Sequence, residues 1–124
     1  VWDLNIGYGT GGRVPVNDWI INYNTYVTND AWMVPFWWKR LMEDPQFKTE
    51  LKTRWVELRA NVLSTSKVIE LTSNTANYLI VNNAILRNYT KWTGINFDYN
   101  SGVNELKTYL TNRLSWMDSK ILAF

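Results

Sequence analysis

The stretch VNELKTYLTNRLSWMDSKI, residues 103–121, decides the fold class of this chain. Its apolar side chains recur at steps of three and four residues, at Val103, Leu106, Leu110, Leu114, Met117 and Ile121. Such steps place side chains on one face of an α-helix. We therefore expect a helix at about residues 102–122, with Ser101 as its N-cap and its apolar face buried.

Three further helices are expected before this one, at about residues 35–43, 45–63 and 67–92. Asp44 suits an N-cap and Pro45 a first helical position, and apolar residues then recur at helical steps from Phe47 to Val62. The expected apolar face of the third helix consists of Val68, Leu71, Thr75, Leu79, Asn82 and either Ile85 or Leu86.

Residues 1–34 have a different pattern. The first residues indicate a short strand, and Gly7 and Gly9 indicate a turn after it. Residues 20–28 alternate weakly, which indicates a short strand or an extended loop. We therefore predict a mainly α fold with an extended segment and loops at its amino end. At 124 residues the chain matches one domain, and residues 1–124 are interpreted as a single, partial domain.

The composition excludes several kinds of chemistry. The chain has no histidine and no cysteine, so it contains no zinc site of the usual kind, thiolate nucleophile, imidazole base or disulfide. A metal would need oxygen ligands, which suits Mg²⁺ or Ca²⁺. The formal charge is only +2 and the basic residues are scattered, which argues against nucleic acid as a partner. No apolar stretch is long enough for a transmembrane helix.

Trp2-Asp3-Leu4-Asn5 places a carboxylate on the expected strand, just before the glycine turn. A carboxylate presented in this way often faces a metal or a phosphate. Because only Val1 comes before this motif, we expect the other half of such a site to lie outside the chain. The alternative is that Asp3 only caps the glycine turn.

Eight tryptophans in 124 residues permit two interpretations. Most of them lie at helical spacing among other apolar residues, which favours a role in the core. Trp19 and Trp32 lie in the irregular amino-terminal third and are the better candidates for exposure. Together with Tyr23 and Tyr26, they could stack on sugar rings or anchor an interface.

Several polar residues also have two interpretations. Arg54 and Arg59 could hold a phosphate, or they could form ion pairs on and between helices. Asp118 is expected to pair with a nearby lysine or arginine. Asn82 and Asn83 are unusual inside a helix, because asparagine is a weak helix former. They are interpreted either as buried polar links between helices or as a ligand contact.

Taken in order, five blocks resemble the C-terminal portion of the CotH-type kinase family, which includes bacterial spore-coat proteins. Each block alone would be weak evidence, and the resemblance rests on their order along nearly the whole chain. The blocks are Trp2-Asp3-x-x-Ile6-x-Tyr8-Gly9, the stretch from Pro35 to Phe47, Arg54 to Arg59, Arg87-Asn88, and Arg113 to Asp118.

This resemblance implies an atypical protein-kinase-like fold that uses ATP and Mg²⁺ to phosphorylate protein serines. By position, Asp3 matches the first metal-binding acid of the family, and Asn5 stands at the second acidic position. An asparagine carbonyl can coordinate Mg²⁺ but brings no charge. The nucleotide-binding lobe and the catalytic aspartate would lie before Val1, so we expect no catalytic residue within this chain and no catalysis by it alone. The family also implies a secreted or cell-surface bacterial protein.

Three classes of function follow. The first is a fragment of a CotH-like kinase, with Asp3 as its main functional residue. The second is a non-catalytic secreted module that binds carbohydrate or protein. The third is a helical scaffold or pseudokinase whose partner is the missing amino-terminal lobe. In that case the isolated chain should expose an apolar face around Trp2, Ile6 and Trp38, and could form a homodimer.

Overall fold

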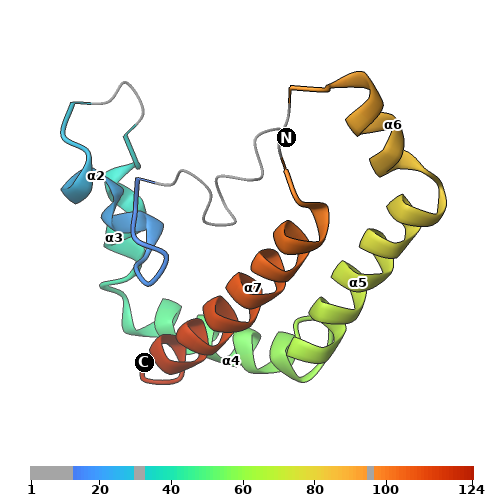
Figure 1. Ribbon diagram of the computed structural model, residues 1–124. Helices are drawn as coiled ribbons and strands as arrows, with labels where there is room; N and C mark the ends of the chain where they lie inside the picture. Colours follow the sequence, from blue (N-terminus) through green and yellow to red (C-terminus); the bar gives the residue numbers. More distant parts are fainter. Residues whose placement is uncertain (1–12, 30–32, 95–96) are drawn as a thin grey trace.

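The computed structural model of the chain describes residues 13–29, 33–94 and 97–124 (Figure 1). Helices account for all the regular structure of these described residues, which confirms the mainly α fold. The elements are a 3₁₀ turn η1 (Ile20–Asn22) and the α-helices α2 (Tyr23–Tyr26), α3 (Phe36–Leu41), α4 (Pro45–Ala60), α5 (Thr65–Val81), α6 (Ala84–Lys91) and α7 (Tyr99–Ile121). The strand expected at the amino end lies outside the described residues.

Helices α5 and α7 lie side by side and run in opposite directions, and α4 crosses near the end of α7 and the start of α5 (Figure 1). Helix α6 follows α5 at the other end of this pair. The short elements α2 and α3 lie beyond the first turn of α4, away from α5 and α6.

The core lies where α4 meets α7. Trp55 of α4 and Leu114 and Ile121 of α7 are buried there. Partly buried apolar residues pack against this cluster, namely Trp19, Leu51, Leu63, Val68 and Met117. The core therefore joins residues from the amino-terminal third, α4, α5 and α7.

The expected apolar face of α7 is confirmed, since each of its residues is buried or half-buried. The expected face of α4 is confirmed from Phe47 to Leu58, but Val62 is 62% exposed because α4 ends at Ala60. Asp44 caps α4 by accepting a hydrogen bond from the backbone N–H of Gln46, with Pro45 in the first turn. The expected cap of α7 is wrong: Asp98, and not Ser101, accepts from the first backbone N–H groups, so the helix begins at Tyr99.

The single helix expected at residues 67–92 is wrong, because the chain forms two helices, α5 and α6. Asn83 separates them with φ 55° and ψ 22°, the left-handed conformation that asparagine tolerates better than most residues. The Asn82 side chain donates to the carbonyl of Tyr78, and Arg87 donates to the carbonyl of Asn82. Asn82 and Asn83 are both exposed, so they end a helix and are not buried links between helices.

The expected apolar face of α5 is confirmed only in part. Val68 and Leu79 are half-buried, and Val68 packs against the core, but Leu71 is 69% exposed and Thr75 is exposed. Ala76 is buried instead, and Thr72 and Ser73 are half-buried. The hydroxyls of Thr72 and Ser73 donate to the backbone carbonyls four residues earlier, so both are satisfied within α5.

Residues 20–26 are helical, and not the expected strand or extended loop. The carboxylate of Asp18 accepts hydrogen bonds from the backbone N–H of Trp19 and the side chain of Asn22, and so favours the tight turn of η1. The side chain of Asn24, within α2, exchanges two hydrogen bonds with the backbone of Val34. These local polar contacts outweigh the weak alternation of the sequence.

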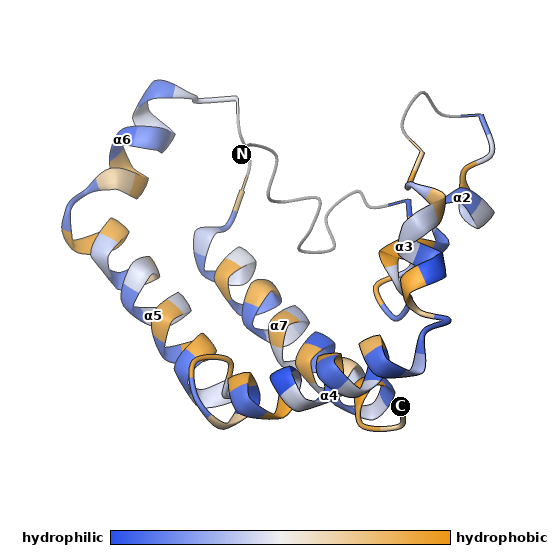
Figure 2. Ribbon diagram, turned by 180° about the vertical axis from the view of Figure 1, so that it is seen from behind, coloured by the Kyte–Doolittle hydropathy of each residue, from blue (hydrophilic) through white to orange (hydrophobic). Residues whose placement is uncertain are grey.

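Apolar side chains are exposed on several helices, and Figure 2 shows orange residues among blue ones on α3 and α5. Phe36 is 83% exposed and Trp37 52% exposed, whereas Trp38, expected on an apolar face, is half-buried. The expected partners of Trp38 on that face, Trp2 and Ile6, lie outside the described residues. No helix of the described part is both long enough and apolar enough to cross a membrane.

Candidate functional site

An ion pair between α4 and α7 joins two of the sequence blocks. The guanidinium of Arg59 donates from Nε to Oδ1 of Asp118 at 2.9 Å and from Nη2 to Oδ2 at 2.9 Å. Trp55 donates from Nε1 to the same Oδ1 at 2.8 Å. The side chains of Arg59 and Asp118 are only 21% and 28% exposed, so this pair is shielded from water. The expectation that Asp118 pairs with a basic residue is confirmed.

The other donors of Arg59 are also occupied. Nη1 donates to the carbonyl of Leu63, and Nη2 donates to the hydroxyl of Thr65 at 3.1 Å. Since Nε, Nη1 and Nη2 all have partners, Arg59 has a structural role and does not offer a phosphate site. Arg54 instead forms an exposed pair with Glu57 at 2.9 Å. The ion-pair interpretation therefore holds for both arginines.

Arg113 of α7 holds the chain that precedes η1. Its Nη1 donates to the carbonyl of Val16 and, at 3.0 Å, to the carbonyl of Asp18. The same guanidinium lies over the ring of Trp116, 4.3 Å from its centroid, and 5.8 Å from that of Trp19. The rings of Trp19 and Trp116 are 4.6 Å apart and tilted by 58°. We call Arg113, Trp19 and Trp116 the α7 clamp.

Asp18 organises the turn beside the α7 clamp. Its Oδ2 accepts a hydrogen bond from the hydroxyl of Tyr26, and its Oδ1 accepts from the backbone of Trp19 and the side chain of Asn22. The Tyr26 hydroxyl bond is the main cause that lowers the pKa of Asp18 from its ordinary value, and the Trp19 N–H adds to it. The same bond raises the pKa of Tyr26. The carboxylate is therefore held in its charged form.

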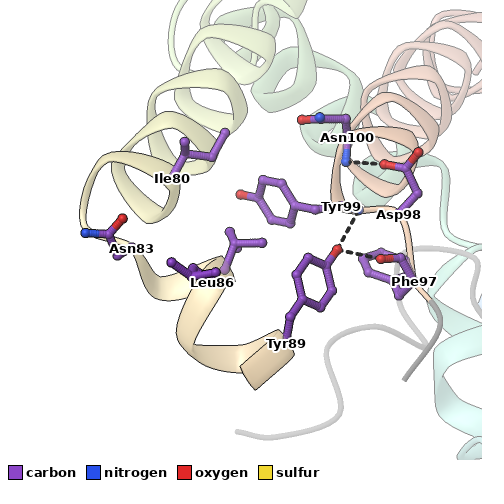
Figure 3. A pocket seen from close by; sticks show the side chains of 9 residues that line it. Ile80, Asn83, Leu86, Tyr89, Phe97, Asp98, Tyr99 and Asn100 are labelled. Carbon is purple, nitrogen blue, oxygen red and sulfur yellow. Dashed lines mark hydrogen bonds between the residues drawn. The ribbon is translucent and has the colours of Figure 1, made fainter. Parts of the chain in front are cut away.

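A pocket of about 580 Å³ lies between the end of α5, α6 and the start of α7 (Figure 3). The hydroxyl of Tyr89 donates to the carbonyl of Phe97 and accepts from the backbone N–H of Tyr99. The hydroxyl of Tyr99 donates to the carbonyl of Ala76 at 3.1 Å. With both hydroxyls occupied, the two rings offer mainly apolar surface. The lining residues are Ile80, Asn83, Ile85, Leu86, Tyr89, Phe97, Asp98, Tyr99 and Asn100.

The sequence did not indicate this pocket, because it depends on the break at Asn83. A single helix through residues 67–92 would place Leu86 and Tyr89 further along the α5 axis. The two adjacent asparagines were the one signal in the sequence that pointed to the break.

The expected metal ligands Asp3 and Asn5 lie outside the described residues, and so does Trp32. Within the described ranges, no three acidic side chains come together in a way that could hold a metal ion. Asp3 and Asn5 therefore remain predictions from the sequence.

The remaining expected aromatic residues lie in one region of the structure but do not form an open platform. Trp19 is half-buried in the α7 clamp and not exposed as expected. Tyr23 is half-buried, and its hydroxyl accepts a hydrogen bond from Arg13 at 3.2 Å. Tyr26 is 47% exposed, with its hydroxyl bound to Asp18. Sugar binding by these residues stays a prediction.

Comparison with known proteins gives one match. A family model described as CotH kinase protein matches residues 1–117. This range includes the motif with Asp3, and it ends one residue before Asp118. Neither a curated protein nor a solved structure matches the chain.

Proposed function

Because this chain belongs to the CotH kinase protein family, we propose that it forms the helical part of an ATP- and Mg²⁺-dependent kinase that phosphorylates protein serines. The observation that carries the proposal is the match over residues 1–117, which includes the Trp2-Asp3-Leu4-Asn5 motif. On the same family resemblance we propose a secreted or cell-surface location.

The chemistry of Asp3 and Asn5 fits a magnesium site. Their side chains offer a carboxylate and an amide carbonyl, the hard oxygen ligands that Mg²⁺ prefers. A bound Mg²⁺ would neutralise the negative charge on the phosphates of ATP during phosphoryl transfer. We assign Asp3 the larger share of the affinity, because Asn5 brings no charge.

The described helices support this proposal as a scaffold. Phosphoryl transfer depends on positioning and charge neutralisation, so a carboxylate that binds the metal needs a rigid support. The shielded pair of Arg59 and Asp118 joins α4 to α7, and both residues belong to blocks on which the family resemblance rests. In this proposal the blocks that contain Arg59 and Asp118 stabilise the fold and take no part in the reaction.

A second candidate function is a non-catalytic module that binds protein. It is favoured by the exposure of Phe36 and Trp37, since aromatic residues are common anchors of interfaces. Trp37 also lines an apolar groove of about 260 Å³, together with Ile21, Trp38, Leu41, Met42, Phe47 and Leu51. A pseudokinase that keeps the scaffold without activity would use the same surface.

Nucleotide binding separates these candidates. We expect Mg²⁺ and ATP together to raise the melting temperature of the full-length gene product, because a ligand that binds only the folded state stabilises it. Asp3→Ala should remove most of the Mg²⁺-dependent part of this rise. Glu70→Ala, which changes an exposed carboxylate of α5, is the matched control and should keep it. A wild-type protein that shows no shift with Mg²⁺ and ATP would contradict the proposal and leave the binding module as the better account.

A further inference from the structure

The pocket between the end of α5, α6 and the start of α7 has the size and the lining of a small-molecule site. Its volume of about 580 Å³ lies within the range of about 300–1,000 Å³ that is usual for such sites. All of its lining residues belong to the described ranges, and most of them are apolar or aromatic. Figure 3 shows the ring of Tyr99 pointing from α7 toward Ile80 and Leu86.

Hydrogen bonds hold two aromatic walls of this pocket in place. The hydroxyl of Tyr89 on α6 is bonded to the carbonyl of Phe97 and to the backbone N–H of Tyr99, which ties α6 to the start of α7. The hydroxyl of Tyr99 donates to the carbonyl of Ala76 on α5 at 3.1 Å. Because both rings are already fixed, little side-chain freedom is lost when a ligand enters.

The third aromatic wall, Phe97, depends on a glycine of α7. A Cβ atom added to Gly102 would overlap with Cζ of the Phe97 ring, so the ring packs directly against the backbone of the helix. Phe97 is itself exposed, and its ring has space on the other side. An alanine at position 102 should therefore displace the ring and leave α7 folded, since alanine is the better helix former.

The charge of the lining selects among ligands. Asp98 is the one charged residue of the lining. Its Oδ1 accepts hydrogen bonds from the backbone N–H groups of Asn100 and Ser101, whereas its Oδ2 accepts none from the described residues. An anionic ligand would meet this carboxylate and no positive side chain. A cation would be attracted by the carboxylate and by the faces of the aromatic rings.

We propose that this pocket binds a small organic ammonium ion, whose apolar body lies among Ile80, Leu86 and the aromatic rings and whose charged nitrogen lies near the carboxylate of Asp98. The proposal goes beyond the proposed kinase activity and does not depend on it, because none of these residues belongs to the motif with Asp3.

The test compares three probes of similar size and different charge in the full-length gene product. These are phenethylamine, phenethyl alcohol and phenylacetate, and titrations followed by ligand-observed nuclear magnetic resonance give the Kd of each. We expect a Kd of about 1 mM or lower for the amine, about threefold or more below that of the alcohol, with phenylacetate weakest. No binding of the amine, or a Kd no lower than that of the alcohol, would overturn the proposal.

A pair of glycine variants locates the binding. Gly102→Ala displaces the Phe97 ring, and we expect it to raise the Kd of the amine about fivefold. The matched control is Gly94→Ala, because a Cβ added there meets no atom within 4 Å, and it should bind the amine as wild type does. If circular dichroism shows that Gly102→Ala is unfolded, Phe97→Ala carries the same test. An unchanged Kd in the folded variant would place the amine elsewhere and overturn the proposal.

A second pair of variants tests the role of the charge. Asp98→Asn removes the charge but keeps a side chain that caps the start of α7. We expect it to raise the Kd of the amine toward that of the alcohol and to leave the Kd of the alcohol unchanged. Glu70→Gln, which removes an exposed carboxylate near the start of α5, should change neither. An Asp98→Asn variant that binds the amine as tightly as wild type would contradict the proposal.

Discussion

Asp118 of α7 and Arg59 of α4 form a bidentate ion pair, with both bonds at 2.9 Å, across 59 positions of sequence. Trp55 donates to the same carboxylate from inside the core. The pair thus places a charge contact at the crossing of the two helices that carry most of the buried apolar residues. It is therefore a shielded polar contact between α4 and α7 where the two helices cross.

Removing Asp118 should strongly destabilise the fold. Asp118→Ala leaves the shielded Arg59 without its carboxylate, and we expect a loss of about 3 kcal/mol in the free energy of unfolding. Urea unfolding followed by circular dichroism measures this loss. The control is Arg54→Ala, which breaks the exposed pair with Glu57 and should cost less than about 0.5 kcal/mol. Equal losses in the two variants would show that the Asp118 pair is not the stronger contact.

Position 83 should tolerate glycine better than alanine, as measured by the stability of the two variants. Its φ of 55° costs an alanine about 1 kcal/mol, whereas glycine adopts this conformation without strain. We therefore expect Asn83→Ala to lower the urea midpoint and Asn83→Gly to keep or raise it. If residues 67–92 formed one continuous helix, Asn83→Ala would instead be more stable than Asn83→Gly, because alanine is the better helix former. A more stable alanine variant would thus favour the single long helix.

The turn around Asp18 should respond to acid. Its pKa is lowered in the folded protein, mainly by the Tyr26 hydroxyl, so the folded state binds its proton less readily than the unfolded state does. The stabilisation is complete above the ordinary aspartate pKa of 3.8 and is lost as the pH falls through the lower, folded value. We expect the difference in melting temperature between wild type and Asp18→Asn to shrink as the pH falls below about 5. A constant difference would show that the charge of Asp18 contributes nothing.

The exposed aromatic residues of α3 should promote self-association of the 124-residue chain when it is expressed alone. Phe36 and Trp37 are exposed to 83% and 52%, and apolar surface of this kind tends to become covered. Sedimentation velocity should detect dimers or larger species at micromolar concentration. Replacing both residues by serine should shift the population toward monomer, whereas Lys39→Ser on the same helix should not. A wild-type chain that is monomeric throughout would contradict this expectation.

The sequence predicted the amphipathic helices well, because their apolar residues repeat at helical spacing. The apolar faces of α4 and α7 could be predicted from that spacing alone. The chemical type of the partner of Asp118 was also predictable, but Arg59 was not identifiable as that partner, since the contact depends on how two distant helices cross. Contacts between distant segments of this kind carry no local signal.

Other features depended on tertiary context. Thr72 and Ser73 are half-buried on α5 beside the buried Ala76, although both look polar in the sequence. Their hydroxyls are satisfied within the helix itself. Asn83 was visible as a weak helix former, but its left-handed conformation was not. The pocket between α5, α6 and α7 could not be predicted for the same reason, because it depends on the break at Asn83. Asp3 and Asn5 stay predictions, because they lie outside the described residues.

The most direct test of the central claim is phosphoryl transfer by the full-length gene product. Transfer of labelled γ-phosphate from ATP to a serine-containing protein is measured with Mg²⁺ and with Mg²⁺ removed by chelator. We predict Mg²⁺-dependent transfer by the wild type, a loss of about a hundredfold or more in Asp3→Ala, and normal transfer in Glu70→Ala. Wild-type protein that transfers no phosphate, or an Asp3→Ala variant as active as wild type, would contradict the account.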